Sequence, residues 1–206
     1  MRIGLLADIH EAVPQLRQAL ERFRDLAVDE VVVVGDICAM HERLTETVAL
    51  LREARAVGVW GNHDFGLCQP DGPTLGRLFS ADELAYMRTL GPILVRDDCL
   101  ITHVEPWLDP NDLAQLWYFD GVPDTVEKLA RCFNAVPYRV LISGHVHRWL
   151  LGTPDGVLAW AGEESIYLRR PTRFLLQMHA VCRGHCAIYD TESTQLTPMT
   201  LDGPFE

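Results

Sequence analysis

The chain has 206 residues, of which 48% are hydrophobic, and its formal net charge is −11. A chain of this length can bury a sizeable core, so we expect a single domain over residues 1–206. The negative charge argues against binding to an anionic membrane surface, and against nucleic acid larger than a small nucleotide, because like charges repel.

The N-terminal residues do not resemble a secretion signal, because Asp8 interrupts the apolar run before it reaches the required length. No apolar stretch approaches the length of a transmembrane helix. We therefore expect a cytoplasmic protein with no membrane partner. Six scattered cysteines are then expected to be reduced thiols, mostly in the core, rather than a disulfide framework; they are Cys38, Cys68, Cys99, Cys132, Cys182 and Cys186.

The first third of the sequence alternates between apolar strands and helical spacing. Strands are predicted at residues 2–7, 31–34 and 57–60, and helices after Pro14 and over residues 44–56. The four valines at 31–34 predict a strand that is buried on both faces, as in the centre of a parallel sheet. Gly35 follows, which permits an unusual backbone conformation or a close approach before Asp36. Strands joined by helical crossovers predict a parallel sheet with right-handed connections.

The remaining sequence predicts further helices and antiparallel hairpins. Residues 69–76 are expected to be a loop, and Ser80 with Glu83 has the form of a capping box for a helix that runs to about Leu90. Strands at 93–95 and 99–102 form one hairpin, and a helix at 125–133 precedes a strand at 138–142. Two more hairpins are predicted, one from strands 149–151 and 157–160, the other from strands 174–181 and 185–189 around Arg183-Gly184.

Polar residues recur where these strands end. Nine of them lie at or just after the ends of five predicted strands: Asp8, His10, Asp36, Asn62, His63, Asp64, His103, His145 and His147. A single histidine or aspartate at a strand end is usually a surface or capping residue, but that explanation does not account for nine. Imidazole and carboxylate groups are ligands for zinc, manganese, iron or nickel. The set is large enough for two metals that share one carboxylate.

The same residues resemble the ordered motifs of the calcineurin-like metallophosphoesterases, in particular the short, single-domain phosphodiesterase-like members. The motifs are Asp8-x-His10, Gly35-Asp36, Gly61-Asn62-His63-Asp64, His103 and Gly144-His145-Val146-His147. The resemblance implies an α/β (α+β) fold, a four-layer αββα sandwich of two mixed β-sheets flanked by helices. It also implies two divalent metal ions (Mn, Fe, Ni or Zn). Asp8, His10, Asp36 and His147 would hold one of them, and Asp36, Asn62, His103 and His145 the other.

The resemblance implies a metal-dependent phosphoesterase that acts by in-line attack of a hydroxide bridging the metals. His63 would be the general acid that protonates the leaving oxygen, and Asp64 would orient its ring. We expect a small phosphorylated substrate, best a phosphodiester or nucleotide. The alternatives are a phosphomonoesterase or protein phosphatase, and a non-catalytic metal-binding scaffold for protein interaction. The presence of His63 and Asp64 favours the enzyme.

Two departures from the family bear on the substrate. Asp36 is followed by Ile37-Cys38-Ala39-Met40 rather than by two residues and Asp-Arg-Gly. The substrate-binding arginine of the branch that resembles Ser/Thr protein phosphatases is therefore missing, which argues against a protein phosphatase or a diadenosine tetraphosphatase. Leu175-Leu176-Gln177-Met178 stands where short phosphodiesterase-like members carry an Asn-Pro-Gly-Ser loop, so the pocket is expected to differ on that side.

Three groups of residues remain outside the motifs. Trp107, Trp117, Tyr118 and Phe119 suit either a nucleotide pocket or, the favoured interpretation, a core or homodimer contact. Arg148, Arg169, Arg170 and Arg173 are candidates to contact phosphate, with solvated surface as the favoured interpretation. A hairpin at Arg183-Gly184 would keep His179, Cys182, His185 and Cys186 from converging, which argues against a structural zinc.

Overall fold

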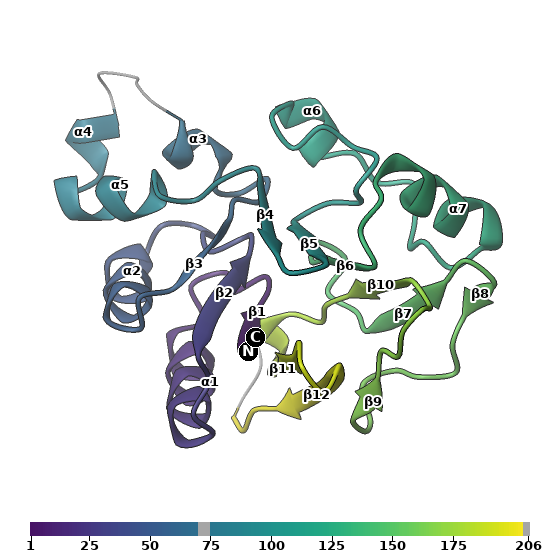
Figure 1. Ribbon diagram of the computed structural model, residues 1–206. Coiled ribbons are helices and arrows are strands. Elements are labelled where there is room, and N and C mark those ends of the chain that lie inside the picture. The colour runs from purple at the N-terminus through teal and green to yellow at the C-terminus, as the bar shows by residue number, and fades with distance from the viewer. Residues whose placement is uncertain (70–74, 204–206) are drawn as a thin grey trace.

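The computed structural model describes residues 1–69 and 75–203, and in these ranges two six-stranded sheets pack face to face (Figure 1). The first sheet has, in spatial order, β3 (Val57–Val59), β2 (Glu30–Val34), β1 (Arg2–Leu6), β11 (His185–Asp190), β12 (Gln195–Thr200) and β9 (Ile166–Tyr167). The second has β4 (Ile93–Arg96), β5 (Cys99–Thr102), β6 (Val140–Ser143), β10 (Phe174–Gln177), β7 (Leu150–Thr153) and β8 (Gly156–Val157).

Both sheets are mixed. The strands β1, β2 and β3 are parallel to one another, and β11, β12 and β9 continue that sheet in antiparallel pairing. In the second sheet β5, β6 and β10 are parallel, and the antiparallel strands lie at its edges. The parallel core predicted from the N-terminal βα units is confirmed, because β1, β2 and β3 follow one another through helical crossovers as expected.

Helices cover the outer faces of the sheets (Figure 1). They are α1 (Val13–Asp25), α2 (Leu44–Glu53), α3 (Phe65–Cys68), α4 (Leu75–Leu78), α5 (Ala81–Met87), α6 (Leu113–Leu116), α7 (Val126–Ala135) and the 3-10 helix η1 (Val181–Arg183). The four-layer αββα arrangement implied by the family resemblance is confirmed. None of the helices in the described ranges is long and apolar enough to cross a membrane.

Three apolar clusters hold the four layers together, and the strand alternation decides which residue enters which cluster. Val32 and Val34 of β2 point into the cluster between the sheets, while Val33 points to the helix-facing side. This is the strand buried on both faces that four successive valines predict. On the far side, Leu129 and Phe133 of α7 pack on the second sheet.

Several local predictions are confirmed in detail. The Ser80 hydroxyl accepts a hydrogen bond from the Glu83 amide at 3.2 Å, and the Glu83 carboxylate accepts one from the Ser80 amide at 2.6 Å, so the capping box is present. The hairpins β4–β5 and β7–β8 form as expected. The predicted loop at 69–76 lies mostly outside the described residues, and Leu75–Leu78 is helical rather than loop.

The second predicted C-terminal hairpin is wrong. β10 and β11 belong to different sheets, and η1 lies between them instead of a two-residue turn. β11 pairs instead with β1 on one side and with β12 on the other, where Cys186 lies opposite Met199. A period-2 pattern shows where strands lie but not which strands pair, because pairing depends on contacts with distant strands.

Arg139, which directly precedes β6, ties the two sheets together. Its guanidinium donates to the Asp98 carboxylate at 2.5 Å, to the Leu168 carbonyl at 2.7 Å and to the Tyr189 hydroxyl at 3.0 Å. Tyr189 lies on β11 of the first sheet, so one cation satisfies groups from both layers. The side chain of Arg139 is only 9% exposed, so these partners replace water.

We expect Arg139→Met to lower the free energy of unfolding by about 2 kcal/mol, because the Leu168 carbonyl and the Tyr189 hydroxyl lose a buried donor, and the half-buried Asp98 carboxylate keeps only Arg170. Urea denaturation followed by circular dichroism measures this. Arg169→Met, at an exposed position, is the control and is expected to change stability by less than about 0.5 kcal/mol. Equal stability of the two variants would contradict the bridging role of Arg139.

Candidate metal centre

The nine strand-end residues come together at one edge of the sandwich. Parallel strands place their carboxyl ends at the same edge of a sheet, so Asp8 after β1 and Asp36 after β2 become neighbours. The second sheet adds His103 after β5 and the pair His145 and His147 after β6. The gathering predicted from the sequence is therefore present, as three overlapping groups of potential ligands whose atoms lie within 4.8 Å of one another.

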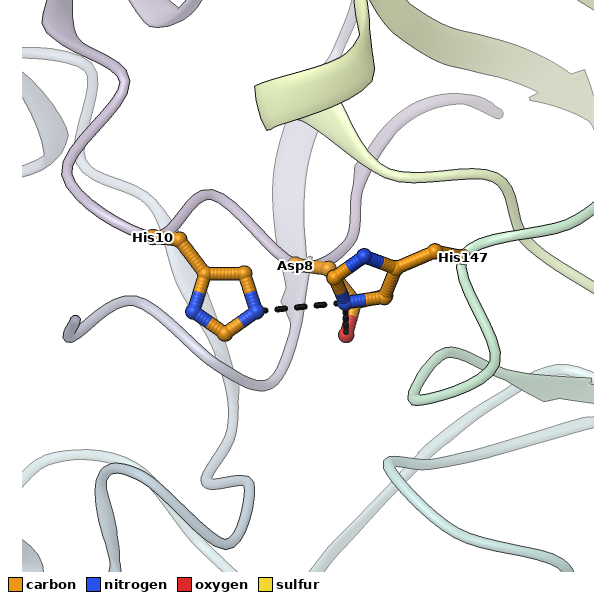
Figure 2. A group of neighbouring side chains, drawn as sticks. All are labelled: Asp8, His10 and His147. Atoms are coloured by element: carbon orange, nitrogen blue, oxygen red, sulfur yellow. Dashed lines mark hydrogen bonds and ion pairs between the residues drawn. The ribbon is translucent and has the colours of Figure 1, made fainter. Parts of the chain in front are cut away.

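The first group consists of Asp8, His10 and His147 (Figure 2). The His147 Nε2 atom is 3.3 Å from Asp8 Oδ1 and 3.2 Å from His10 Nε2. Two imidazole nitrogens and a carboxylate oxygen therefore face one point from two different loops. This is the donor set expected for a divalent transition metal.

The second group consists of Asp36, His103 and His145, and Asn62 belongs to it as a neutral oxygen donor. His103 Nε2 is 3.3 Å from Asp36 Oδ2 and 3.3 Å from His145 Nδ1. The Asn62 Oδ1 atom is 3.0 Å from both ring nitrogens. The four side chains expected at the second metal are thus in mutual contact.

Asp36 lies between the two groups. Its Oδ2 atom is 3.3 Å from His103 Nε2 and 3.7 Å from His10 Nε2, so one carboxylate oxygen faces both clusters. Its Oδ1 atom accepts a hydrogen bond from the backbone amide of His63 at 3.0 Å. The residue is therefore positioned to be shared by two cations.

The histidine rings are oriented by backbone carbonyls on their far side. His10 Nδ1 is 2.9 Å from the Cys38 carbonyl, and His103 Nδ1 is 2.9 Å from the Val34 carbonyl. A carbonyl can only accept, so each Nδ1 carries a proton, and each Nε2 has a lone pair for a metal when the ring is neutral. This second contact is characteristic of metal-ligating histidines, and the residues present fit two divalent cations.

Five of these ligands adopt a left-handed backbone conformation that is unfavourable for residues with a side chain. They are Asp8 (φ 52°), His10 (φ 44°), Asp36 (φ 55°), His145 (φ 72°) and His147 (φ 50°). Each costs about 1–3 kcal/mol, and such strain collects at functional sites where the surrounding structure enforces it. Here the enforcement includes backbone bonds between the two loops, from the Asp8 amide to the Gly35 carbonyl and from the His10 amide to the Asp36 carbonyl, both at 3.0 Å.

Glycines let the loops approach this closely. A Cβ atom on Gly61 would lie 2.1 Å from Asp36 Oδ1, and one on Gly35 would lie 2.3 Å from His103 Nδ1. A Cβ on Gly144 would lie 2.8 Å from Asp8 Oδ2. Gly35 also has φ +89°, so the role expected for the glycine before Asp36 is confirmed on both grounds, conformation and close approach.

Asp64 lies beneath the site, where it supports the loops. Its carboxylate accepts hydrogen bonds from the amides of Ile37 and Cys38 at 2.9 Å and of Gly61 at 3.0 Å, and it is fully buried. Burial raises its pKa, and the nearby Asp36 charge adds to this. Among the hydrogen bonds of the described residues none joins Asp64 to the His63 ring. Its observed role is to fix the loop that carries Asp36.

The sequence analysis missed Glu11, which has a similar supporting role. This 6%-exposed carboxylate accepts hydrogen bonds from the amides of Ala39, His41 and Arg43 at 2.8–2.9 Å. It holds the loop after Asp36 against the loop after β1. The only local signal is an acidic residue directly after His10, which does not distinguish it from a surface glutamate.

His63 is exposed and stands at the open side of the centre. Its ring lies 4.9 Å from the His10 ring and 5.1 Å from the Trp117 ring, measured between centroids. The same residue joins His10 and Asp36 in the third group of potential ligands. A histidine in this place can reach both the metals and a substrate that approaches from solvent.

The charges inside the centre perturb its histidines in opposite directions. Burial opposes protonation of His103, but the Asp36 carboxylate outweighs it and raises the pKa to about 9. The hydrogen bond that the His147 ring donates to the Asp8 carboxylate, together with its hydrogen bond with Cys182, raises the pKa of His147 to about 10. Burial, together with repulsion from His103, lowers the pKa of His145 to about 4. Without metal, His103 and His147 are therefore expected to be in the charged imidazolium form at neutral pH.

The chain matches a model of the calcineurin-like phosphoesterase superfamily domain over residues 1–163. This match covers well over half of the sequence and includes all of the motif residues. The protein belongs to the calcineurin-like phosphoesterase superfamily. The family consists of phosphoesterase hydrolases, which agrees with the centre described above.

Relatives and solved structures agree with this placement. The chain is 29% identical over 197 residues to the uncharacterized protein MJ0912 of Methanocaldococcus jannaschii, with 87% of this chain and 75% of that protein covered. It is 23% identical over 158 residues to the phosphodiesterase MJ0936 of the same organism, with 77% and 80% covered. A metallophosphoesterase from Sphaerobacter thermophilus has the same fold, with a TM-score of 0.78 at 21% identity, covering 99% of this chain and 90% of that one.

The four arginines considered for phosphate contact have different surroundings. Arg173 donates to the carbonyls of Phe133, Val136 and Tyr138 at 2.5–2.9 Å, so it is neither a solvated arginine nor a phosphate ligand but a cap for the end of α7. Arg170 pairs with Asp98 at 2.7 Å, and Arg169 lies over the Tyr167 ring. Arg148 is exposed directly after His147 and remains a candidate.

The histidines and cysteines near η1 lie closer together than predicted. The rings of His179 and His185 are 4.0 Å apart, and Cys182 is a hydrogen-bond partner of His147. The hairpin turn predicted between them is wrong, because η1 takes its place, but the four side chains do not converge on one point. Cys186 does point away, into the core. All six cysteines are unpaired and five of them are buried.

We expect Gly61→Ala to weaken metal binding at least about tenfold, because the new methyl group would displace the Asp36 carboxylate that faces both clusters. Titration of the metal-free protein with Mn²⁺, followed by calorimetry, measures the affinity. Gly66→Ala is the matched control, since a Cβ there meets no atom within 4 Å. Unchanged affinity in Gly61→Ala would contradict a role in metal binding for the close approach between Gly61 and Asp36.

Metal binding at pH 7 is expected to release about two protons, because His103 and His147 are protonated in the metal-free protein and must lose their protons to ligate. For the same reason the affinity is expected to rise with pH up to about 9–10, the pKa values of these two groups. Calorimetry in buffers of different ionisation enthalpy counts the protons. His147→Ala should reduce the number by about one, and release of no protons would contradict the assignment.

Proposed function

We propose that this protein hydrolyses phosphodiesters, small nucleotides among them, with two divalent metal ions drawn from Mn, Fe, Ni and Zn. The observation that carries the proposal is the position of Asp36, whose Oδ2 atom faces His10 at 3.7 Å and His103 at 3.3 Å. A carboxylate shared by two groups of nitrogen and oxygen donors is what a two-metal hydrolase requires.

The donor set explains how an acidic protein can bind an anionic substrate. The chain carries a net charge of −11, and a phosphodiester adds a further negative charge. When bound, two divalent ions supply positive charge for the phosphate and lower the pKa of a water molecule to produce a nucleophile at neutral pH. The residues of the chain then have to orient the ester and move one proton.

His63 is the residue best placed to move that proton. It is exposed, its ring lies beside His10, and its own amide is fixed by Asp36 at 3.0 Å. A protonated imidazole at the open side of the centre can donate to the leaving oxygen as the ester bond breaks. The expected sequence of events is therefore binding of the phosphate at the metals and proton donation from His63.

Similar proteins support a phosphodiester as the substrate. One curated relative is named a phosphodiesterase, and one solved structure of the same fold, with a TM-score of 0.55, is described as a novel archaeal phosphodiesterase. Another, also with a TM-score of 0.55, is described as a putative diadenosine tetraphosphatase. The missing Asp-Arg-Gly motif after Asp36 favours the first of these two activities.

We expect His63→Ala to lower kcat for a chromogenic phosphodiester by about 100- to 10,000-fold, the usual contribution of a general acid. Metal content, measured by elemental analysis, should stay at the wild-type level. His41→Ala replaces another exposed histidine, outside the groups of potential ligands, and is expected to keep full activity.

Two outcomes would count against this proposal. Hydrolysis that survives in His63→Ala would exclude His63 as the acid. A fully metal-loaded wild-type protein that cleaves no mono- or diester would instead favour a metal-binding scaffold. Comparison of the rates for a phosphomonoester, a phosphodiester and a dinucleoside polyphosphate distinguishes the reaction types, and the diester is expected to be the fastest.

A further inference from the structure

Three successive aromatic side chains are exposed next to the metal centre. Trp117, Tyr118 and Phe119, which follow α6, are 54%, 45% and 58% exposed, and we call them the aromatic wall. Neither the core nor a helix face buries them, so of the favoured interpretation, a core or homodimer contact, the core part is wrong for these three. Large apolar side chains gathered on a surface usually mark a binding site.

The aromatic wall lies directly beside the two histidines that flank the open side of the centre. The Trp117 ring is 5.1 Å from the His63 ring, and the Phe119 ring is 6.2 Å from the His145 ring. Tyr118 and Phe119 also line a narrow pocket together with His145. A substrate held at the metals would therefore meet aromatic faces with its organic group.

The aromatic wall is held in place from behind. Trp107 packs against Tyr118 with the ring centroids 5.6 Å apart, and the Arg131 guanidinium lies 3.8 Å from the Trp107 ring centroid. Arg131 also pairs with Asp120 at 2.9 Å. The Tyr118 ring is thus supported before a ligand arrives, which reduces the entropy lost on binding.

Charge restricts what the aromatic wall can accept. Residues 105–124 contain five acidic side chains and no lysine or arginine. Lys128 and Arg131 pair with Asp120, but Asp109, Asp112 and Asp124 are exposed without a cation partner among the ion pairs of the described residues. A second phosphate group here would be repelled, whereas an uncharged ring can stack on the aromatic faces.

We propose that the aromatic wall binds the ring of the substrate's organic group, a nucleobase or an aryl ring, so that the preferred substrate is a diester with one phosphate and an aromatic substituent. Trp117 lies beside His63, the proposed proton donor. The ring that stacks on Trp117 therefore belongs to the leaving group, which receives the proton from His63. That the bound ring belongs to a substrate rests on the proposed hydrolase function. A homodimer contact is the competing occupant.

Binding of adenosine 5′-monophosphate and of inorganic phosphate to the metal-loaded protein tests the proposal by calorimetry. We expect Trp117→Leu and Phe119→Leu to weaken binding of the nucleotide by about tenfold each, as for the loss of one stacked base. Binding of inorganic phosphate should stay unchanged, because it needs only the metals. Tyr167→Leu removes an aromatic side chain of similar exposure on β9 and is the matched control.

Equal nucleotide affinity in wild type and Trp117→Leu would overturn the proposal, as would an equal loss for nucleotide and phosphate. Sedimentation of the wild type as a dimer that Trp117→Leu dissociates would assign the aromatic wall to a second copy and also overturn it. A metal-loaded wild type that cleaves no ester would refute the proposed function. In that case, weaker binding of the nucleotide but not of phosphate in Trp117→Leu and Phe119→Leu would still support a ring-binding surface. Unchanged binding of the nucleotide in these variants would overturn the ring-binding surface.

Discussion

The Asp36 carboxylate is the group on which the rest of the site depends, because it faces two clusters of donors, each of which combines side chains from both sheets. His103 reaches it from β5 of the second sheet, and His10 reaches it from the loop after β1 of the first. In the proposed two-metal centre, a shared carboxylate reduces the number of charges that must be gathered while both cations keep an oxygen ligand.

The Asp36 carboxylate and its neighbours are placed by backbone conformations that are unfavourable in themselves. Five ligands have positive φ angles, and three glycines remove the Cβ atoms that would collide with ligands. The unfavourable conformations are offset by buried carboxylates that accept several amide hydrogen bonds, Asp64 under the Asp36 loop and Glu11 beside it. The two sheets supply the rigid support, with Arg139 bonded to both.

The residues around the centre determine which kind of substrate suits it. In the proposed function of this acidic chain, positive charge for the phosphate comes from bound metals rather than from an arginine cluster, because Arg173 and Arg170, the obvious candidates, are committed to carbonyls and to Asp98. The open side instead carries His63 and the aromatic wall. The proposed pair of cations at the base and the aromatic rings at the rim together suit an ester with one phosphate and one flat organic group.

The sequence by itself determined the strands other than β9 and β12, the parallel order of β1, β2 and β3, and the residues that meet at their ends. Valine runs and helical spacing are local patterns, and parallel strands bring their carboxyl ends together whatever the loops do. Only the tertiary structure decided the parts that depend on distant contacts: the separation of β10 and β11 into two sheets, the support given by Glu11 and Asp64, and the exposure of the aromatic wall. Glu11 accepts from amides 28 to 32 residues away and Asp64 from the amides of Ile37 and Cys38, 27 and 26 residues away, so no local pattern records which side chain meets which amide.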